Sequence, residues 1–295
     1  MSALIGAAQR PRVTVVGSVN LDLVVRVPRL PNAGETIGGA VLERYPGGKG
    51  GNQALAAARL GAVVRLLACV GRDAAADQAL GLLRAAGVDL SGVSVATEAA
   101  TGVALIAVAP DGENQIVVAP GANAQLGVEH LPPDHGDILI CQLEVPVATI
   151  LEACLGSRAF VCVNLAPAQA VDAALFERAD LLIVNETEAQ FYGDALKQAR
   201  GWVAISCGRR GAELWWDGAR IATAATTAVT AVDTSGAGDA FVAALALQLF
   251  ARTAPAQALA FACAAGAIAV TRAGAQAGMP TLEQIGVLLS LPAVR

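Results

Sequence analysis

Short apolar runs alternate along the chain with longer stretches of helical periodicity. This alternation predicts an α/β fold with a mostly parallel sheet sandwiched by helices, in which ligands bind beyond the carboxyl ends of the strands. The predicted strands are Val13–Val16, Val63–Cys69, Ile138–Cys141, Phe160–Val163, Leu181–Val184 and Val203–Ser206. The predicted helices are Asn52–Leu60, Ala74–Ala86, Val147–Leu155 and Thr187–Ala199.

Two segments interrupt this rhythm and predict a small β-sheet inserted in the α/β core. Residues 23–45 and 101–119 lack helical periodicity and carry extended, turn-punctuated sequence. Within the second segment, Asp111-Gly112 predicts a hairpin turn between two apolar runs. The core is therefore expected to comprise residues 11–22, 46–100 and 120–295.

Composition and charge narrow the class of protein. The 295 residues are 55% hydrophobic with a formal net charge of -5, which gives no electrostatic reason for nucleic-acid binding. The six cysteines are scattered without a CxxC pair, so they predict buried thiols in a reducing compartment rather than a zinc site. Residues 253–271 are uncharged but alanine-rich, typical of a buried helix rather than a membrane span. Since the first twelve residues are too weakly apolar for a signal peptide, a cytoplasmic protein without a membrane partner is expected.

The run from Val232 to Phe241, VDTSGAGDAF, is the strongest chemical signal. Small residues precede Asp239, and a helix-periodic apolar pattern begins immediately afterwards. Small residues at a helix start let backbone N–H groups approach an anion, so a phosphate is the expected guest. Asp239 would then accept the proton of an attacking hydroxyl. The alternative is a helix-capping aspartate after a glycine turn.

Two polar segments near the N-terminus suggest a site for a hydroxyl-rich ligand. In Gly47–Asn52, GGKGGN, Lys49 is followed by glycine, so the run lacks the hydroxyl residue of a P-loop. Asn20 and Asp22 lie two apart and share one face of extended chain, as a vicinal diol would require. The alternatives are a glycine-rich turn opening a helix and a polar strand end.

The segment Asn185–Glu188, NETE, follows a predicted strand and is rich in oxygen ligands. Carboxylate and amide oxygens favour a hard cation such as Mg²⁺. Asn185 with Glu188 three residues later also fits a helix-capping box, and the two interpretations are compatible.

These segments, in this order, resemble the ribokinase-like (PfkB) carbohydrate kinase family over about residues 13–280. The resemblance implies a Rossmann-like core with a β-sheet lid that covers a sugar and pairs two subunits into a homodimer. It implies that Asp239 is the catalytic base and that Gly236, Ala237 and Gly238 form the anion hole.

The resemblance also assigns the remaining site residues. It places the sugar against Asn20, Asp22, Gly48, Lys49, Asn52, Ala104, Val118, Glu144 and Asp239. It places ATP against Asn185, Ser206, Gly208, Gly211, Gly238 and Cys263. Glu188, with Asn185, would organise Mg²⁺ through water, and Asp233, Ser235, Ala269, Arg272 and Gly274 would hold K⁺. Two positions depart from the family pattern: Cys263 replaces a polar residue near adenine, and Gly278 replaces a frequent serine at the K⁺ site.

The implied activity is ATP-dependent phosphorylation of D-ribose at its 5-hydroxyl, giving ribose 5-phosphate and ADP. The alternatives are a kinase of the same family that acts on deoxyribose, fructose, pseudouridine or adenosine, and a non-catalytic sugar-binding regulator. The polar segments around Asp22 and Lys49 favour a free sugar, because the expected lid has only Tyr45 as an aromatic wall for a base.

Overall fold

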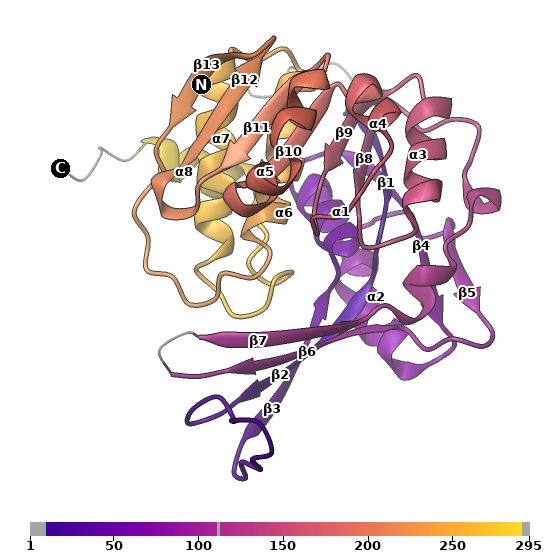
Figure 1. Ribbon diagram of the computed structural model, residues 1–295, viewed down its shortest axis with the longest axis vertical. Helices are drawn as coiled ribbons and strands as arrows, with labels where there is room; N and C mark the ends of the chain where they lie inside the picture. Colours follow the sequence, from indigo (N-terminus) through magenta and orange to yellow (C-terminus); the bar gives the residue numbers. More distant parts are fainter. Residues whose placement is uncertain (1–9, 111–112, 291–295) are drawn as a thin grey trace.

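The computed structural model describes residues 10–110 and 113–290, whose nine-stranded central sheet has the order β13-β12-β11-β10-β9-β8-β1-β4-β5 (Figure 1). Pairing is parallel from β11 to β5 and antiparallel at the β12–β13 edge. The strands are β1 (Arg12–Val16), β4 (Val63–Gly71), β5 (Val93–Ala96), β8 (Ile138–Gln142), β9 (Phe160–Asn164), β10 (Leu181–Asn185), β11 (Trp202–Ser206), β12 (Ala212–Trp216) and β13 (Ala219–Ala224). The predicted mostly parallel sheet is confirmed.

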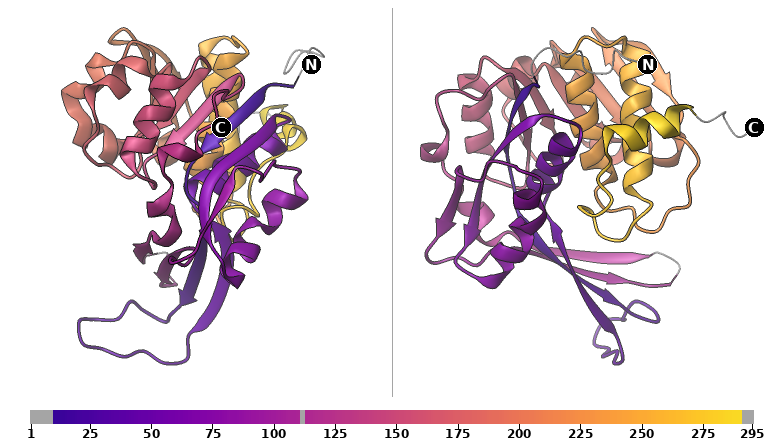
Figure 2. Two further views of the ribbon diagram at one scale, coloured as in Figure 1. Left: turned by 90° about the vertical axis from the view of Figure 1, so that its right-hand side faces the viewer. Right: turned by 180° about the vertical axis from the view of Figure 1, so that it is seen from behind.

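Helices cover both faces of the central sheet, as the two further views make clear (Figure 2). Successive residues of one strand enter opposite cores: Ile138 and Ile140 pack with the first helix group, and Leu139 and Cys141 with the second. The first group is α1 (Lys49–Arg59), α2 (Ala74–Ala85), α6 (Ala237–Phe250), α7 (Pro255–Ala269) and α8 (Leu282–Ser290). The second group is α3 (Val147–Gly156), α4 (Ala173–Arg178) and α5 (Glu186–Tyr192).

A second, four-stranded sheet projects from the carboxyl-end side of the core, in the order β3-β2-β6-β7. Its outer pairs are antiparallel and its central β2–β6 pair is parallel. Its strands are β2 (Asn20–Arg26), β3 (Val41–Gly47), β6 (Gly102–Val108) and β7 (Asn114–Ala119). The predicted turn Asp111-Gly112 lies outside the described residues, but the antiparallel β6–β7 pair flanks it.

Some predicted helix boundaries were wrong, for identifiable reasons. Helix α1 begins at Lys49 instead of Asn52, because Gly50 can pack directly on the backbone of Gly17 and Ser18. Any Cβ on Gly50 would lie 2.5 Å from the carbonyl carbon of Gly17. The predicted Thr187–Ala199 helix is α5 followed by a 3₁₀ segment, since Gly193 breaks it with φ 48°. The alanine-rich stretch 253–271 forms buried α7, and no helix among the described residues is long and apolar enough to span a membrane.

Candidate active site

The first turn of α6 places the strongest sequence motif at the carboxyl edge of the central sheet. Gly236 caps the helix with φ 76°, a left-handed conformation that suits glycine. A Cβ there would lie 2.9 Å from the side chains of Ala275 and Met279, so the capping position is also closely packed. The turn Gly236–Asp239 therefore presents backbone N–H groups that the helix does not pair internally.

A cavity of about 220 Å³ lies at this turn and brings separate motifs together. We call it the active-site cavity. Its lining includes Gly236, Gly238 and Asp239 from the α6 turn, together with Lys49 and Glu188. Asn164, Asn185 and Ser206, which end β9, β10 and β11, contribute its opposite side. Parallel strands thus deliver their polar terminal residues to one edge.

The Asp239 carboxylate is buried and held at both oxygens. Asn52 Nδ2 donates to Oδ2 at 2.9 Å, and Gln53 Nε2 donates to Oδ1 at 3.0 Å. Burial raises the pKa of Asp239, while the Lys49 charge and the hydrogen bond from Asn52 oppose that rise. A buried carboxylate with two amide donors is a fixed proton acceptor.

The expected sugar-binding acids Glu144 and Asp22 lie near the N-terminal end of α1. Glu144 Oε2 accepts a hydrogen bond from Ser18 Oγ at 2.5 Å and from the Lys49 backbone N–H at 3.1 Å. Asn20 Oδ1 accepts one from Asn123 Nδ2 at 2.7 Å. The pKa of Asp22 is raised to about 7, first by burial and then by the negative charges of neighbouring acids, Glu144 foremost.

The small sheet places Asp22, Ala104 and Val118 in one row across three strands. Directly paired residues point to the same face of a sheet, so both apolar side chains share the face of the Asp22 carboxylate. Ala104 is buried, whereas Val118 is 48% exposed. Gly48 lies against the backbone of Ser18 and Asn20, where a Cβ would be 2.7 Å from the Asn20 nitrogen.

The Lys49 side chain lies near three acidic side chains from different segments of the chain. Burial alone would lower its pKa, but the negative charges of Asp239, Glu144 and Glu188 outweigh burial and raise it. Its side chain lines the active-site cavity with Glu188 and Asp239. A buried ammonium in that position neutralises an otherwise acidic site and can also attract an anion.

Asn185 and Glu188 form the capping box of α5. Asn185 Oδ1 accepts from the Glu188 backbone N–H at 2.8 Å, and Glu188 Oε2 accepts from the Asn185 backbone N–H at 2.7 Å. Burial raises the pKa of Glu188, against the Asn185 hydrogen bond and the Lys49 charge. Both residues also line the active-site cavity. The described residues contain no cluster of three or more His, Cys, Asp or Glu side chains suited to a metal.

The glycine-bearing loop after β11 lies beside α7. Gly208 and Gly211 have φ values of 55° and 99°, and the Cys207 backbone N–H donates to Gly211 O at 2.8 Å. A Cβ on Gly211 would meet Ala224 O at 1.9 Å, and Cys263 Sγ lies 3.9 Å from the same oxygen. The expected ATP residues Ser206, Gly208, Gly211 and Cys263 therefore belong to neighbouring segments.

The proposed K⁺ residues come from two loops that Asp233 joins. Its Oδ1 accepts from the Ser235 backbone N–H at 2.9 Å, and its Oδ2 from the Gly274 backbone N–H at 2.8 Å. Burial alone would raise the pKa of Asp233, but these two hydrogen bonds outweigh burial and lower it. Ala269 ends α7, and a Cβ on Gly278 would lie 2.1 Å from the Ala269 carbonyl oxygen. Close packing against Ala269 therefore leaves no room for a side chain at position 278. Arg272 lies in the same loop and is exposed.

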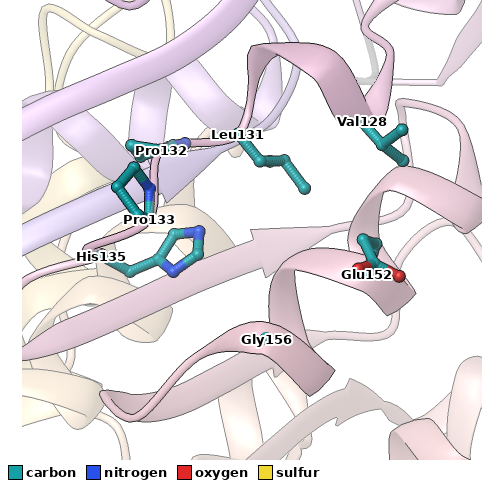
Figure 3. A pocket seen from close by; sticks show the side chains of 7 residues that line it. All are labelled: Val128, Leu131, Pro132, Pro133, His135, Glu152 and Gly156. Atoms are coloured by element: carbon teal, nitrogen blue, oxygen red, sulfur yellow. The ribbon is translucent and has the colours of Figure 1, made fainter.

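A larger cavity of about 450 Å³ lies apart from these motifs, between residues 128–135 and α3 (Figure 3). Leu131, Pro132 and Pro133 form much of its wall, with Glu152 on the opposite helix. The chemistry-bearing residues line the smaller cavity, which is therefore the candidate active site.

Several residues at the site were not singled out by the sequence analysis. Ser18 and Asn123 hold the acid and amide of the expected sugar side, and Gln53 and Asn164 hold the base side. Ser18 lies within a segment that was recognised, so its neighbours Asn20 and Asp22 were an available signal. No local spacing links Gln53 to Asp239 or to Asn164, because these contacts join residues 186 and 111 positions apart.

Comparison with known proteins identifies the family of the chain. The model of the pfkB family carbohydrate kinases matches residues 10–282. The chain is 35% identical over 294 residues to ribokinase from Bacillus subtilis (strain 168), covering 94% of this chain and 99% of the relative. Its structure is similar to that of ribokinase from Thermotoga maritima, with a TM-score of 0.86, 33% identity and coverage of 95% and 100%. It is also similar to Arabidopsis thaliana ribokinase complexed with ribose and ATP, with a TM-score of 0.83, 28% identity and coverage of 96% and 100%. The chain therefore belongs to the pfkB family of carbohydrate kinases.

Proposed function

We propose that the protein transfers the γ-phosphoryl group of ATP to the 5-hydroxyl of D-ribose, giving ribose 5-phosphate and ADP. The observation that carries this function is the position of buried Asp239. It lies in the first turn of α6, within one cavity that also contains the strand-end residues of β9, β10 and β11. The ribokinase relatives and the ribose–ATP complex of a similar structure support ribose as the acceptor.

Different residues bind the sugar, accept its proton and stabilise the transferring phosphoryl group. Asp22 and Glu144 accept hydrogen bonds from ribose hydroxyls, while Ala104 and Val118 cover its apolar edges. Asp239 receives the proton of the attacking hydroxyl. The α6 turn and Lys49 stabilise the negative charge of the transferring phosphoryl group, a term that dominates in phosphoryl transfer. Ser206, Gly208 and Gly211 bind the nucleotide from the opposite side.

The residues also fit a divalent cation on the phosphate side. The buried Glu188 carboxylate faces the active-site cavity with Asn185 beside it, and hard oxygen donors suit Mg²⁺. One carboxylate with few protein ligands is consistent with an ion held mainly by water and phosphate. Bound Mg²⁺ supplies charge neutralisation of the phosphates. Glu188 and Asn185 would hold it in place.

A monovalent cation fits the two loops joined by Asp233. The Asp233 carboxylate bridges residues 233–235 to Gly274. The carbonyl groups of Ser235, Ala269, Arg272 and Gly274 are the proposed further ligands. K⁺ there would neutralise Asp233 and rigidify the loop that leads into the anion hole. It would act on phosphate binding rather than on sugar recognition.

The small sheet is proposed to serve as a lid and as the homodimer contact. All six residues of β7 are exposed, and Val117, which points away from the face of Asp22 and Val118, is 64% exposed. Leu105 on the neighbouring strand is 50% exposed and pairs with Val117. An exposed apolar face beside an open edge strand is a favourable surface for a second copy of the same sheet.

A coupled ADP-release assay tests the acceptor. Ribose, deoxyribose, fructose, adenosine and pseudouridine are compared at equal concentrations with Mg-ATP. We expect the highest kcat/KM with ribose. A higher value with another acceptor would assign the protein to that substrate, and no turnover with any acceptor would favour a sugar-binding regulator.

A further inference from the structure

Gln53 is a fully buried amide that contacts the base from outside the active-site cavity. It lies on α1, directly after Asn52, and has no exposed surface. Its Nε2 donates to Asp239 Oδ1 at 3.0 Å and to Asn164 Oδ1 at 3.3 Å. Asp239 and Asn164 line the cavity, whereas Gln53 does not line it and lies behind them.

The orientation of this amide is fixed by its surroundings. Asn164 Nδ2 donates to the Ile183 carbonyl oxygen at 3.2 Å, and a carbonyl can only accept. Asn164 must therefore present its oxygen to Gln53, and Gln53 must present its NH₂ group to both neighbours. The Gln53 side-chain oxygen has no hydrogen-bond partner among the described residues. The hydrogen-bond chain runs from the strand β10, through Asn164 and Gln53, to the base.

The two amides that hold Asp239 have different surroundings. Asn52 contacts Oδ2, and the family resemblance places it against the sugar, so a bound sugar would compete for it. Gln53 contacts Oδ1 and has no assigned role towards substrate. It can therefore keep the same hydrogen bond throughout the reaction.

We propose that Gln53 is a positioning residue, which fixes the rotamer of Asp239 and stabilises its ionised form. This inference rests on the proposed role of Asp239 as the base. The charged groups that face Asp239 are Lys49, which stabilises the carboxylate, and Glu144 and Asp22, which oppose it. Hydrogen bonds to the ionised form lower the pKa of a buried acid, and Gln53 supplies one of the two that Asp239 receives.

Gln53→Met removes the donor and keeps the length of the side chain. We expect kcat for ribose to fall about 10- to 100-fold, the range for losing a hydrogen bond to a charged group. Both KM values should change little, and the acid limb of the kcat/KM profile should move to higher pH, since the base protonates more readily. Gln53→Leu also removes the donor and should move that limb in the same direction. It covers the case in which Gln53→Met does not fold.

Gln248→Met is the matched control. Gln248 lies on α6 with Asp239 and is also buried, but its side chain bonds to Thr253 at the far end of the helix. We expect this variant to change the urea midpoint without moving the pH profile. A profile that shifts equally in both variants would assign Gln53 a structural role only.

A titration without substrate separates this inference from the proposed function. The carboxyl ¹³C signal of Asp239, identified by its loss in Asp239→Asn, is followed against pH in the wild type and in Gln53→Met. We expect a higher pKa in the variant. Unchanged titration would overturn the inference whatever the activity, whereas inactivity of the wild type towards sugars would overturn the proposed function alone.

Discussion

The surroundings of Asp22 in the folded protein disfavour the ionised form of its side chain. Its pKa is raised from 3.8 to about 7, because burial and the charges of Glu144, Asp239 and Asp233 all disfavour ionisation. Between these two pH values the folded state retains a proton that the unfolded chain has released. Ionisation of Asp22 therefore destabilises the fold progressively as pH rises from about 4, and the full cost is present above about pH 7.

The size of this cost follows from the two pKa values. At about 1.4 kcal/mol for each pH unit, their difference corresponds to roughly 4 kcal/mol near pH 8 and roughly 2 kcal/mol near pH 5. Asn has nearly the same shape as a protonated Asp but no charge. The ligand-free variant Asp22→Asn should therefore be more stable than the wild type by these amounts. The same variant should raise the KM for ribose strongly and leave the KM for ATP nearly unchanged, because only the sugar loses a partner.

Urea unfolding of both proteins near pH 5 and near pH 8, without ligand, measures the effect. Asp77→Asn is the control for the loss of one carboxylate, because Asp77 is exposed on the first turn of α2. A stability gain for Asp22→Asn that is the same at both pH values, or a variant less stable than the wild type near pH 8, would refute the electrostatic reasoning.

Three further predictions concern the base, the cation and the lid. Asp239→Asn should lower kcat roughly 10²- to 10⁴-fold while calorimetry shows ribose binding largely retained; near wild-type turnover would exclude Asp239 as the base. K⁺ should raise kcat or ATP affinity above the values in Na⁺ or in Tris alone, and Asp233→Ala should abolish that response; full activity without a monovalent ion would remove the proposed site. Val117→Lys, on an exposed face, should convert a dimer into a monomer in light scattering at micromolar concentration, and a wild-type monomer would contradict the lid contact.

The central sheet could be predicted from sequence because its strands are buried on both faces. Strands such as β8 and β10 are short, continuous apolar runs, which are typical of strands buried on both faces of a parallel sheet. The β12–β13 edge was missed, although Asp217 and Gly218 form its turn with φ values of 49° and 71°. An Asp-Gly pair between extended segments is a recognised hairpin signal, so this miss was avoidable. The short β5 and α4 carry too few residues for a periodic pattern.

The candidate site could be predicted where residues lie close together in sequence. The α6 turn, the capping box at Asn185 and the sugar-side acids follow from local spacing or from the family resemblance. The Gln53–Asp239 contact joins residues 186 positions apart, and only the packing of α1 against α6 brings them together. Glycines such as Gly50 are likewise explained by a neighbouring backbone that no local pattern reveals.

The most direct test of the proposed function is the identity of the product. Ribose and Mg-ATP are incubated with the protein, and the phosphorus spectrum of the product is recorded with proton coupling. The account predicts a phosphate monoester coupled to two methylene protons, as in ribose 5-phosphate, which forms with the wild type and is lost with Asp239→Asn. A phosphate coupled to a single proton, or product formed equally by the variant, would contradict it.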